Sequence, residues 1–149
     1  MSFSRRFLAL ATWLGLSLFS PFLFGNYGSV TVASIVNVYD GDTFRANIAH
    51  WPDVIGNNTP IRINAVETPE IRGKCAAEKQ LAIQARDFTR EQLLKAELIE
   101  LRNIERGKYF RLVADVYLDG QSLAQQLLAH GLARPYDGNK RHSWCTGTS

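Results

Sequence analysis

Residues 76–95 contain neither Gly nor Pro, and their apolar side chains recur at the spacing of one helix face. Ala77, Leu81, Ala85 and Phe88 share that face, and charged residues occupy the outer one. The segments on either side of this helix have the composition of strands. A single long helix between two groups of strands restricts the possible folds more than any other feature of the chain.

Three strands are expected before the helix. Residues 30–38 are rich in β-branched side chains, and residues 43–48 alternate after an Asp-Gly turn at 40–41, so the two segments predict a hairpin. Residues 50–60 contain two prolines and predict a loop. A third strand is expected over residues 61–66, which gives a meander of three strands with short connections.

Two further strands and a short helix are expected after the long helix. The strands cover residues 98–104 and 109–118, and Ser122 is placed to cap a helix that runs to His130 and ends at Gly131. The resulting order is β-β-β-α-β-β-α. It predicts an α+β, mainly β fold: a five-stranded OB-fold Greek-key barrel with a helix after strand 3 and a short helix after strand 5. Such barrels bind oligonucleotides and oligosaccharides across one face.

The first 27 residues differ in character from the rest of the chain. Arg5 and Arg6 precede an uncharged, apolar run over residues 7–24, which is the form of a secretory signal peptide. The run is also just long enough to remain as an N-terminal membrane anchor, and that alternative stays open. We therefore expect residues 28–149 to form the folded domain, secreted or periplasmic, with membrane association only if the N-terminal segment is not cleaved.

Export would give the two cysteines, Cys75 and Cys145, a structural meaning. An oxidising compartment permits them to pair, and the bridge would close a loop of about seventy residues. The alternative is two unpaired thiols. A catalytic role is not indicated, because neither cysteine lies in the sequence context of a nucleophile.

Four acidic residues frame the second and third expected strands: Asp40, Asp42, Glu67 and Glu70. Carboxylates repel one another when they are brought together, so a fold that gathers them usually does so around a cation. The ligands here are oxygens, with no Cys or His beside them, which indicates a hard ion such as Ca²⁺ or Mg²⁺. Arg62 lies within the third strand, between the two acidic pairs.

Four motifs in this order resemble the staphylococcal nuclease (thermonuclease) family. They are VYDGDTF at 38–44, IRINAVETPE at 61–70, KYFRLVADVYLDG at 108–120 and QQLLAHGLAR at 125–134. The resemblance covers residues 30–136, with the expected helix between the second and third motifs. It implies an OB-fold phosphodiesterase that depends on calcium, cleaves DNA and RNA, and leaves 3′-phosphate ends.

The resemblance also implies roles for the acidic residues. Asp42 and Glu67 would supply carboxylate ligands to one Ca²⁺, together with the backbone carbonyl of Thr68. Glu70 would position or deprotonate the attacking water. This chain departs from the family at Glu67, where aspartate is common, so the distance from ligand to ion and the preference for one metal are open.

Four further residues would contact phosphate. By resemblance, Arg62 and Arg111 would bind the scissile phosphate, and Lys108 and Tyr109 a terminal one. Arginine suits the first role because its planar fork matches two phosphate oxygens and does not lose its proton. Removal of the N-terminal segment lowers the net charge from +3 to +1, so binding of a polyanion would rest on such local clusters.

The sequence thus predicts an exported phosphodiesterase, in particular an endonuclease, acting as a monomer on DNA and RNA with little sequence specificity. The alternative is an OB-fold module that binds nucleic acid without catalysis. Other features have simpler interpretations. Asp40 belongs to a turn dipeptide, the chain from Arg134 is expected to be irregular, and Lys140, Arg141 and His142 form a small basic patch on a solvated tail.

Overall fold

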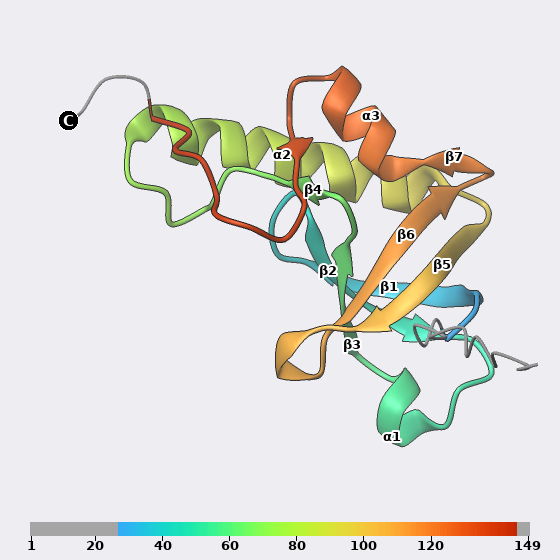
Figure 1. Ribbon diagram of the computed structural model, residues 1–149. Helices are drawn as coiled ribbons and strands as arrows, with labels where there is room; N and C mark the ends of the chain where they lie inside the picture. Colours follow the sequence, from blue (N-terminus) through green and yellow to red (C-terminus); the bar gives the residue numbers. More distant parts are fainter. Residues whose placement is uncertain (1–26, 146–149) are drawn as a thin grey trace, which may run out of the picture.

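A computed structural model describes residues 27–145 and shows a closed barrel of five long strands (Figure 1). The barrel strands are β1 (Val30–Val38), β2 (Thr43–Ile48), β3 (Thr59–Ile63), β5 (Ile99–Arg106) and β6 (Leu112–Leu118). Their order is β3-β2-β1-β5-β6, and β3 also pairs with β6, which closes the sheet. The β3–β6 pairing is parallel, whereas the other barrel pairings are antiparallel. The five-stranded OB-type barrel predicted from the sequence is therefore confirmed.

The barrel is filled by every second side chain of its strands. In β6, Leu112, Ala114, Val116 and Leu118 are buried, and the residues between them are half-buried on the outer surface. Phe44 of β2 is completely enclosed. Burial of one large apolar side chain contributes about 1.5–3 kcal/mol, so this interior supplies most of the stabilisation of the barrel.

Helices cover both ends of the barrel. Figure 1 shows α2 (Ala76–Lys95) and α3 (Leu123–Ala129) together at one end and the short α1 (Asp53–Gly56) at the other. The long helix has the bounds expected from the sequence. The Ser122 hydroxyl caps α3 by accepting a hydrogen bond from the Gln125 N–H at 3.3 Å. Gly131 follows α3 with a φ of +66°, a conformation that glycine adopts without strain.

The buried face of α2 is not the one expected. Glu78, Ala82, Ala85, Thr89 and Leu93 are buried along the helix. Of the residues expected to share the apolar face, Ala77 is exposed, and Leu81 and Phe88 are only partly buried. The face is rotated because the two polar side chains find hydrogen-bond partners outside the helix, as described below.

Several element boundaries also differ from the prediction. The segment 50–60 contains α1 and the start of β3, and the third strand ends early at a turn where Ala65 has a φ of 61°. Beyond that turn, β4 (Val66–Glu67) pairs with β8 (Arg134–Pro135), in a region predicted to be irregular. A two-residue strand, β7 (Gln121–Ser122), extends the sheet beside β6.

The last long strand begins three residues later than predicted. A 3₁₀ turn, η1 (Lys108–Phe110), precedes β6, and the Gly107 N–H donates to the Arg111 carbonyl at 2.7 Å to close it. Tyr109 and Phe110 have positive φ values of 59° and 57°. Their rings project from this tip and are 89% and 84% exposed. Phe110 therefore does not join the buried face of β6.

The sequence predicts features at both ends of the chain. Cys145 forms a disulfide with Cys75, the residue just before α2, so of the two alternatives left open by the sequence the structure has the bridge. The predicted signal peptide or anchor lies almost entirely outside the described residues. Between residues 27 and 145, no helix combines the length and the hydrophobicity needed to cross a bilayer.

Candidate active site

Asp42 lies in the turn that joins β1 to β2 and is 1% exposed. Its Oδ1 atom accepts hydrogen bonds from Arg62 Nη1 at 2.8 Å and from the Thr43 hydroxyl at 2.9 Å. Its Oδ2 atom accepts one from the backbone N–H of Thr68 at 3.0 Å. This one carboxylate therefore ties the β1–β2 turn to β3 and to the segment after β4.

The turn is held by α2. The Thr89 hydroxyl donates to the Gly41 carbonyl at 2.7 Å. A Cβ atom on Gly41 would come within 2.7 Å of the Ala85 Cβ and of the Thr68 Cγ2. The Asp-Gly pair thus does more than make a turn, because only glycine lets the backbone beside Asp42 pack so closely against the helix.

The two arginines of the predicted site are brought together by the parallel pairing of β3 with β6. Ile61 is aligned with Leu112, which places Arg62 and Arg111 close to the same end of the two strands. Arg62 is 9% exposed; its Nη2 atom donates to the Val66 carbonyl at 3.2 Å. Arg111 is half-buried, and its Nε atom has no hydrogen-bond partner within residues 27–145. Both side chains line the same two hollows.

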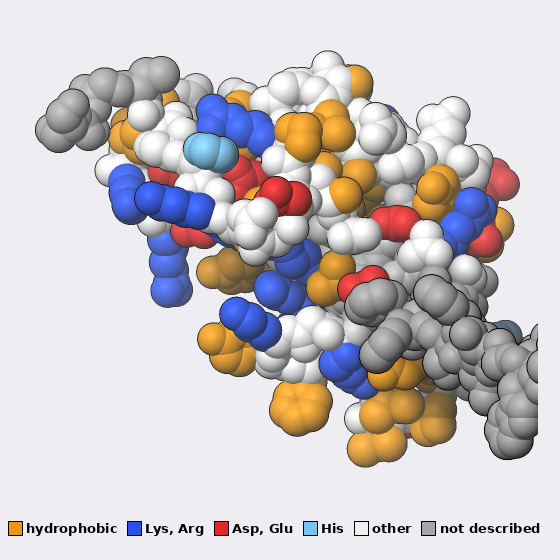
Figure 2. Space-filling view, viewed as in Figure 1, with side chains coloured by type: hydrophobic (Ala, Val, Ile, Leu, Met, Phe, Trp, Pro, Cys, Tyr) orange, Lys and Arg blue, Asp and Glu red, His pale blue; other side chains and the backbone are white. Residues whose placement is uncertain are grey.

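These hollows adjoin one another on one face of the molecule. One, of about 330 Å³, is lined by Asp40, Glu70 and both arginines, among others. The second, of about 490 Å³, includes both arginines, Lys108 and the ring of Tyr136. Figure 2 shows Lys and Arg side chains gathered on the face between the β5–β6 turn and the C-terminal tail.

The expected ligand residues follow β3. Glu67 and Thr68 are each 2% exposed. In the part of the chain that the structure describes, the buried Glu67 Oε2 and Thr68 Oγ1 atoms have no hydrogen-bond partners. Buried polar atoms of this kind are costly unless something satisfies them. Together with Asp42, they form a set of oxygen donors that fits a hard divalent cation.

The acidic side chains do not form a tight three-carboxylate cluster in the described part of the chain. The acidic side chains form ion pairs with arginines instead. Arg62 binds Asp42, while Arg141 binds Glu70 and its Nε atom lies 3.8 Å from Glu67 Oε2. Within residues 27–145, the potential metal-ligating side chains that lie close together are Cys75, Cys145 and Glu78. The two sulfur atoms of this group are bonded to each other in the disulfide.

Lys108 and Tyr109, both expected near phosphate, point to different places. Lys108 lines the larger hollow beside Arg111. Tyr109 lines a separate hollow of about 260 Å³ with Tyr39 and Arg45, on another side of Arg111. The structure therefore places Lys108 with the two site arginines and gives Tyr109 a position at the margin.

Residues 60–145 match the family model described as staphylococcal nuclease homologue. That match covers more than half of the chain. The chain belongs to the staphylococcal nuclease family. A curated relative is the SPbeta prophage-derived endonuclease YokF of Bacillus subtilis (strain 168), which is 32% identical over 97 residues. The aligned part is 64% of this chain but 31% of the relative, so this chain spans less than a third of that protein.

Asp42 lies outside the span matched by the staphylococcal nuclease model, which starts at residue 60. The structure nevertheless connects Asp42 to the matched span, because its carboxylate accepts hydrogen bonds from Arg62 and from the Thr68 N–H, both of which lie inside the span. A feature missed from the sequence is Arg141. The sequence predicts a solvated tail at this residue, whereas in the structure its guanidinium binds the Glu70 carboxylate.

Asp40 also differs from a simple turn residue. It is half-buried, and its Oδ1 atom accepts a hydrogen bond from the Asp42 N–H at 3.1 Å. Burial, together with the adjacent charge of Asp42, raises the pKa of Asp40 from 3.8 to about 7. Folding without a cation therefore favours the protonated form of this side chain.

That raised pKa predicts a pH-dependent effect of Asp40→Asn in chelator. Folded Asp40 keeps its proton to about pH 7, whereas the unfolded chain loses it near 3.8, so the wild-type free energy of unfolding falls between these values. Asp40→Asn has no carboxyl group at this position, so its free energy of unfolding does not fall for this reason. Urea unfolding should therefore show Asp40→Asn gaining stability over wild type as pH rises from about 4 to about 8. Asp53→Asn, at an exposed aspartate, is the control, and an equal difference at both pH values for Asp40→Asn would contradict the prediction.

Proposed function

We propose that this chain is an exported, calcium-dependent nuclease that hydrolyses DNA and RNA with little sequence specificity and leaves 3′-phosphate ends. The observation that carries the proposal is the meeting of Arg62, Arg111 and Glu70 in one hollow, beside the buried oxygens of Asp42 and Glu67. The family match and the endonuclease relative support the same reaction class.

The two arginines suit a phosphodiester. The substrate is an anion, and attack by water places further charge on the oxygens around phosphorus. Guanidinium groups fixed in position before the reaction stabilise that charge without reorganisation. Arg62 is oriented by Asp42 and Val66. Arg111 lines both hollows, and its buried Nε atom has no hydrogen-bond partner among residues 27–145.

Glu70 is the candidate general base. Its side chain is 56% exposed at the edge of the hollow, so it is accessible to water. It would take a proton from the attacking water as the new P–O bond forms. The bond from phosphorus to the 5′ oxygen then breaks, that oxygen takes a proton from solvent water, and the phosphate stays on the 3′ side. A guanidinium group does not readily give up a proton, so we assign Arg111 to charge stabilisation.

Asp42, Glu67 and the Thr68 carbonyl would hold the cation. When bound, it would neutralise charge on the phosphate and so add to the effect of the arginines. Calcium is the proposed ion because it accepts oxygen ligands in flexible geometry, which tolerates the longer side chain of Glu67.

Weak specificity and export complete the proposal. Contacts to phosphate carry no information about base sequence, so the arginine site would act on many sequences. The apolar N-terminal run and the Cys75–Cys145 disulfide both favour an oxidising compartment outside the cytosol. We propose a secreted or periplasmic monomer, tethered to the membrane only if residues 1–27 are retained.

Incubation of the purified protein with labelled single-stranded DNA or RNA tests the function. Cleavage is expected with Ca²⁺, and its loss with chelator, and the products should need phosphatase treatment of their 3′ ends before they can be extended. Glu70→Gln should lower kcat by at least about 10²-fold, as expected for loss of a general base. A protein that binds these strands equally well with Glu70→Gln, and never cleaves them in Ca²⁺, would be the non-catalytic binding module instead.

A further inference from the structure

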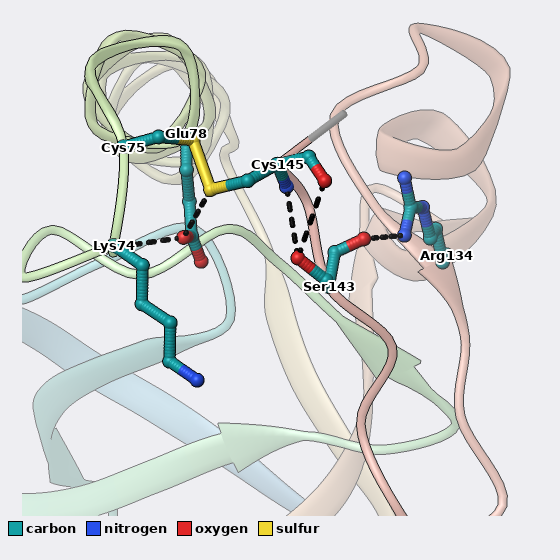
Figure 3. The surroundings of a disulfide bond; sticks show 6 residues. All are labelled: Lys74, Cys75, Glu78, Arg134, Ser143 and Cys145. Carbon is teal, nitrogen blue, oxygen red and sulfur yellow. Dashed lines mark hydrogen bonds between the residues drawn. A yellow bond between two sulfur atoms is a disulfide. The ribbon is translucent and has the colours of Figure 1, made fainter. Parts of the chain in front are cut away.

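The chain after β8 crosses the edge of the site as an irregular segment, residues 136–145, here called the strap. At its start, the Tyr136 N–H donates to the Ala65 carbonyl at 2.9 Å. At its end, the disulfide joins Cys145 to Cys75 at the start of α2 (Figure 3). The strap is therefore attached at both ends to elements that build the site.

Its last residues are fixed by contacts around the disulfide. Arg134 of β8 donates to the Ser143 carbonyl at 3.0 Å, and its guanidinium lies 3.8 Å from the centre of the Trp144 ring. Figure 3 shows Arg134 and Cys145 on either side of Ser143. The Glu78 carboxylate, close to the sulfur of Cys145, accepts a hydrogen bond from the Lys74 N–H at 2.8 Å.

Arg141 reaches inward from the middle of this strap. Its Nη1 atom binds Glu70, and its Nε atom lies 3.8 Å from Glu67 Oε2. Its side chain is 39% exposed and lines both hollows that contain Arg62 and Arg111. A third guanidinium thus lies at the site, in the larger hollow together with Lys108 and close to the acidic residues.

We propose that Arg141 is a substrate-binding residue for a backbone phosphate of the nucleic acid, held in place by the Cys75–Cys145 disulfide. The inference rests on the proposed nuclease function. In the free protein Arg141 compensates Glu67 and Glu70. With a divalent cation held at Glu67, Arg141 would be repelled and no longer needed to compensate the acidic residues, so its guanidinium fork would be released to bind phosphate oxygens.

The disulfide is what makes this placement possible. The strap has no helix or strand of its own, and a free segment of this kind would sample many conformations. Anchoring Cys145 to α2 restricts Arg141 to the neighbourhood of Glu70. Loss of the bridge should therefore have the same effects as loss of the arginine.

Arg141→Ala should change two properties in opposite directions. Calcium affinity without nucleic acid, measured by calorimetry, should rise about fivefold because a competing cation is removed from beside the ligands. For single-stranded DNA, KM should rise about tenfold with kcat within about threefold of wild type. The salt dependence of log(kcat/KM) should become shallower by about 0.7, the contribution of one phosphate contact on a single strand.

Four further variants serve as comparisons. Arg90→Ala removes the same charge from α2, at a residue paired with Asp87, and should leave both properties unchanged. Arg141→Lys keeps the charge without the fork, so KM should rise in part while calcium affinity stays near wild type. The double variant Cys75→Ser/Cys145→Ser, checked for folding by circular dichroism, should resemble Arg141→Ala, and adding Arg141→Ala to it should have no further effect.

Two results would overturn the inference. Weaker calcium binding in Arg141→Ala with an unchanged KM would mean that Arg141 only supports the acidic residues. Unchanged values of both would mean that the strap plays no part in the site. If the wild-type protein fails to cleave DNA, the nuclease function falls, and the affinity for fluorescent single-stranded DNA in Ca²⁺, measured by anisotropy, replaces KM in the same comparison.

Discussion

Replacing Arg111 with alanine should lower kcat by about 10²–10³-fold while the free energy of unfolding stays nearly unchanged. The site would lose a guanidinium aimed at charge that develops on the phosphate. The fold would lose little, because the Nε atom of Arg111 has no hydrogen-bond partner and its side chain takes part in no ion pair among residues 27–145. Under the proposed function, its charge would therefore serve the substrate rather than the fold.

The measurement is kcat at saturating DNA and Ca²⁺, with urea unfolding of the same preparations. Arg111→Lys should recover only part of the rate, because lysine keeps the charge but cannot bind two oxygens at once. Arg106→Ala, at an exposed arginine of β5 across the η1 turn, should keep wild-type kcat. Full activity in Arg111→Ala, or a loss explained by unfolding, would remove Arg111 from the proposed chemistry.

The fold was predictable because its determinants are local. Alternation in β6 and the absence of Gly and Pro across α2 follow directly from which side chains must enter the core. The order of these elements then leaves few arrangements, and the barrel is one of them. The meeting of Arg62 with Arg111 follows from the same topology, since β3 pairs with β6 in parallel.

The departures depend on contacts that lie outside the elements themselves. Thr89 and Glu78 are buried on α2, where an apolar face was expected, because they bind the Gly41 carbonyl and the Lys74 N–H. The hydrophobic periodicity of the helix sequence cannot predict these hydrogen-bond partners. The start of β6 was misplaced for a related reason: β5 ends at Arg106, so the segment before Leu112 has no strand opposite it.

Arg141 could have been found from the cysteines. Glu70 precedes Cys75 by five residues, and Arg141 precedes Cys145 by four. A disulfide between the two cysteines therefore carries an acidic and a basic residue toward one another at similar distances from the bridge. The pairing of Cys75 with Cys145, left open by the sequence, decides whether Arg141 belongs to the tail or to the site.

Arg62→Ala should destabilise the protein by about 3–5 kcal/mol, the usual cost of breaking a buried ion pair, and should also abolish cleavage. The side chains of Arg62 and Asp42 are only 10% and 2% exposed, so the variant would leave the Asp42 charge buried without its guanidinium partner. Urea unfolding in chelator measures this cost. Added Ca²⁺ should restore part of the stability, because an ion that binds the folded state alone stabilises it.

A neutral pair separates the two roles of Arg62. In Asp42→Asn/Arg62→Gln no charge is buried, and the Asn side-chain oxygen can still accept from the Thr68 N–H that Asp42 binds. This double variant should recover most of the stability lost in Arg62→Ala but none of the cleavage, because both the ion ligand and the phosphate contact are gone. Stability that stays as low as in the single variant would mean that the charges themselves are needed to fold the site. If the double variant behaves as expected, the two arginines have different roles. Arg62 would both stabilise the folded site and bind phosphate, whereas Arg111 would only bind phosphate.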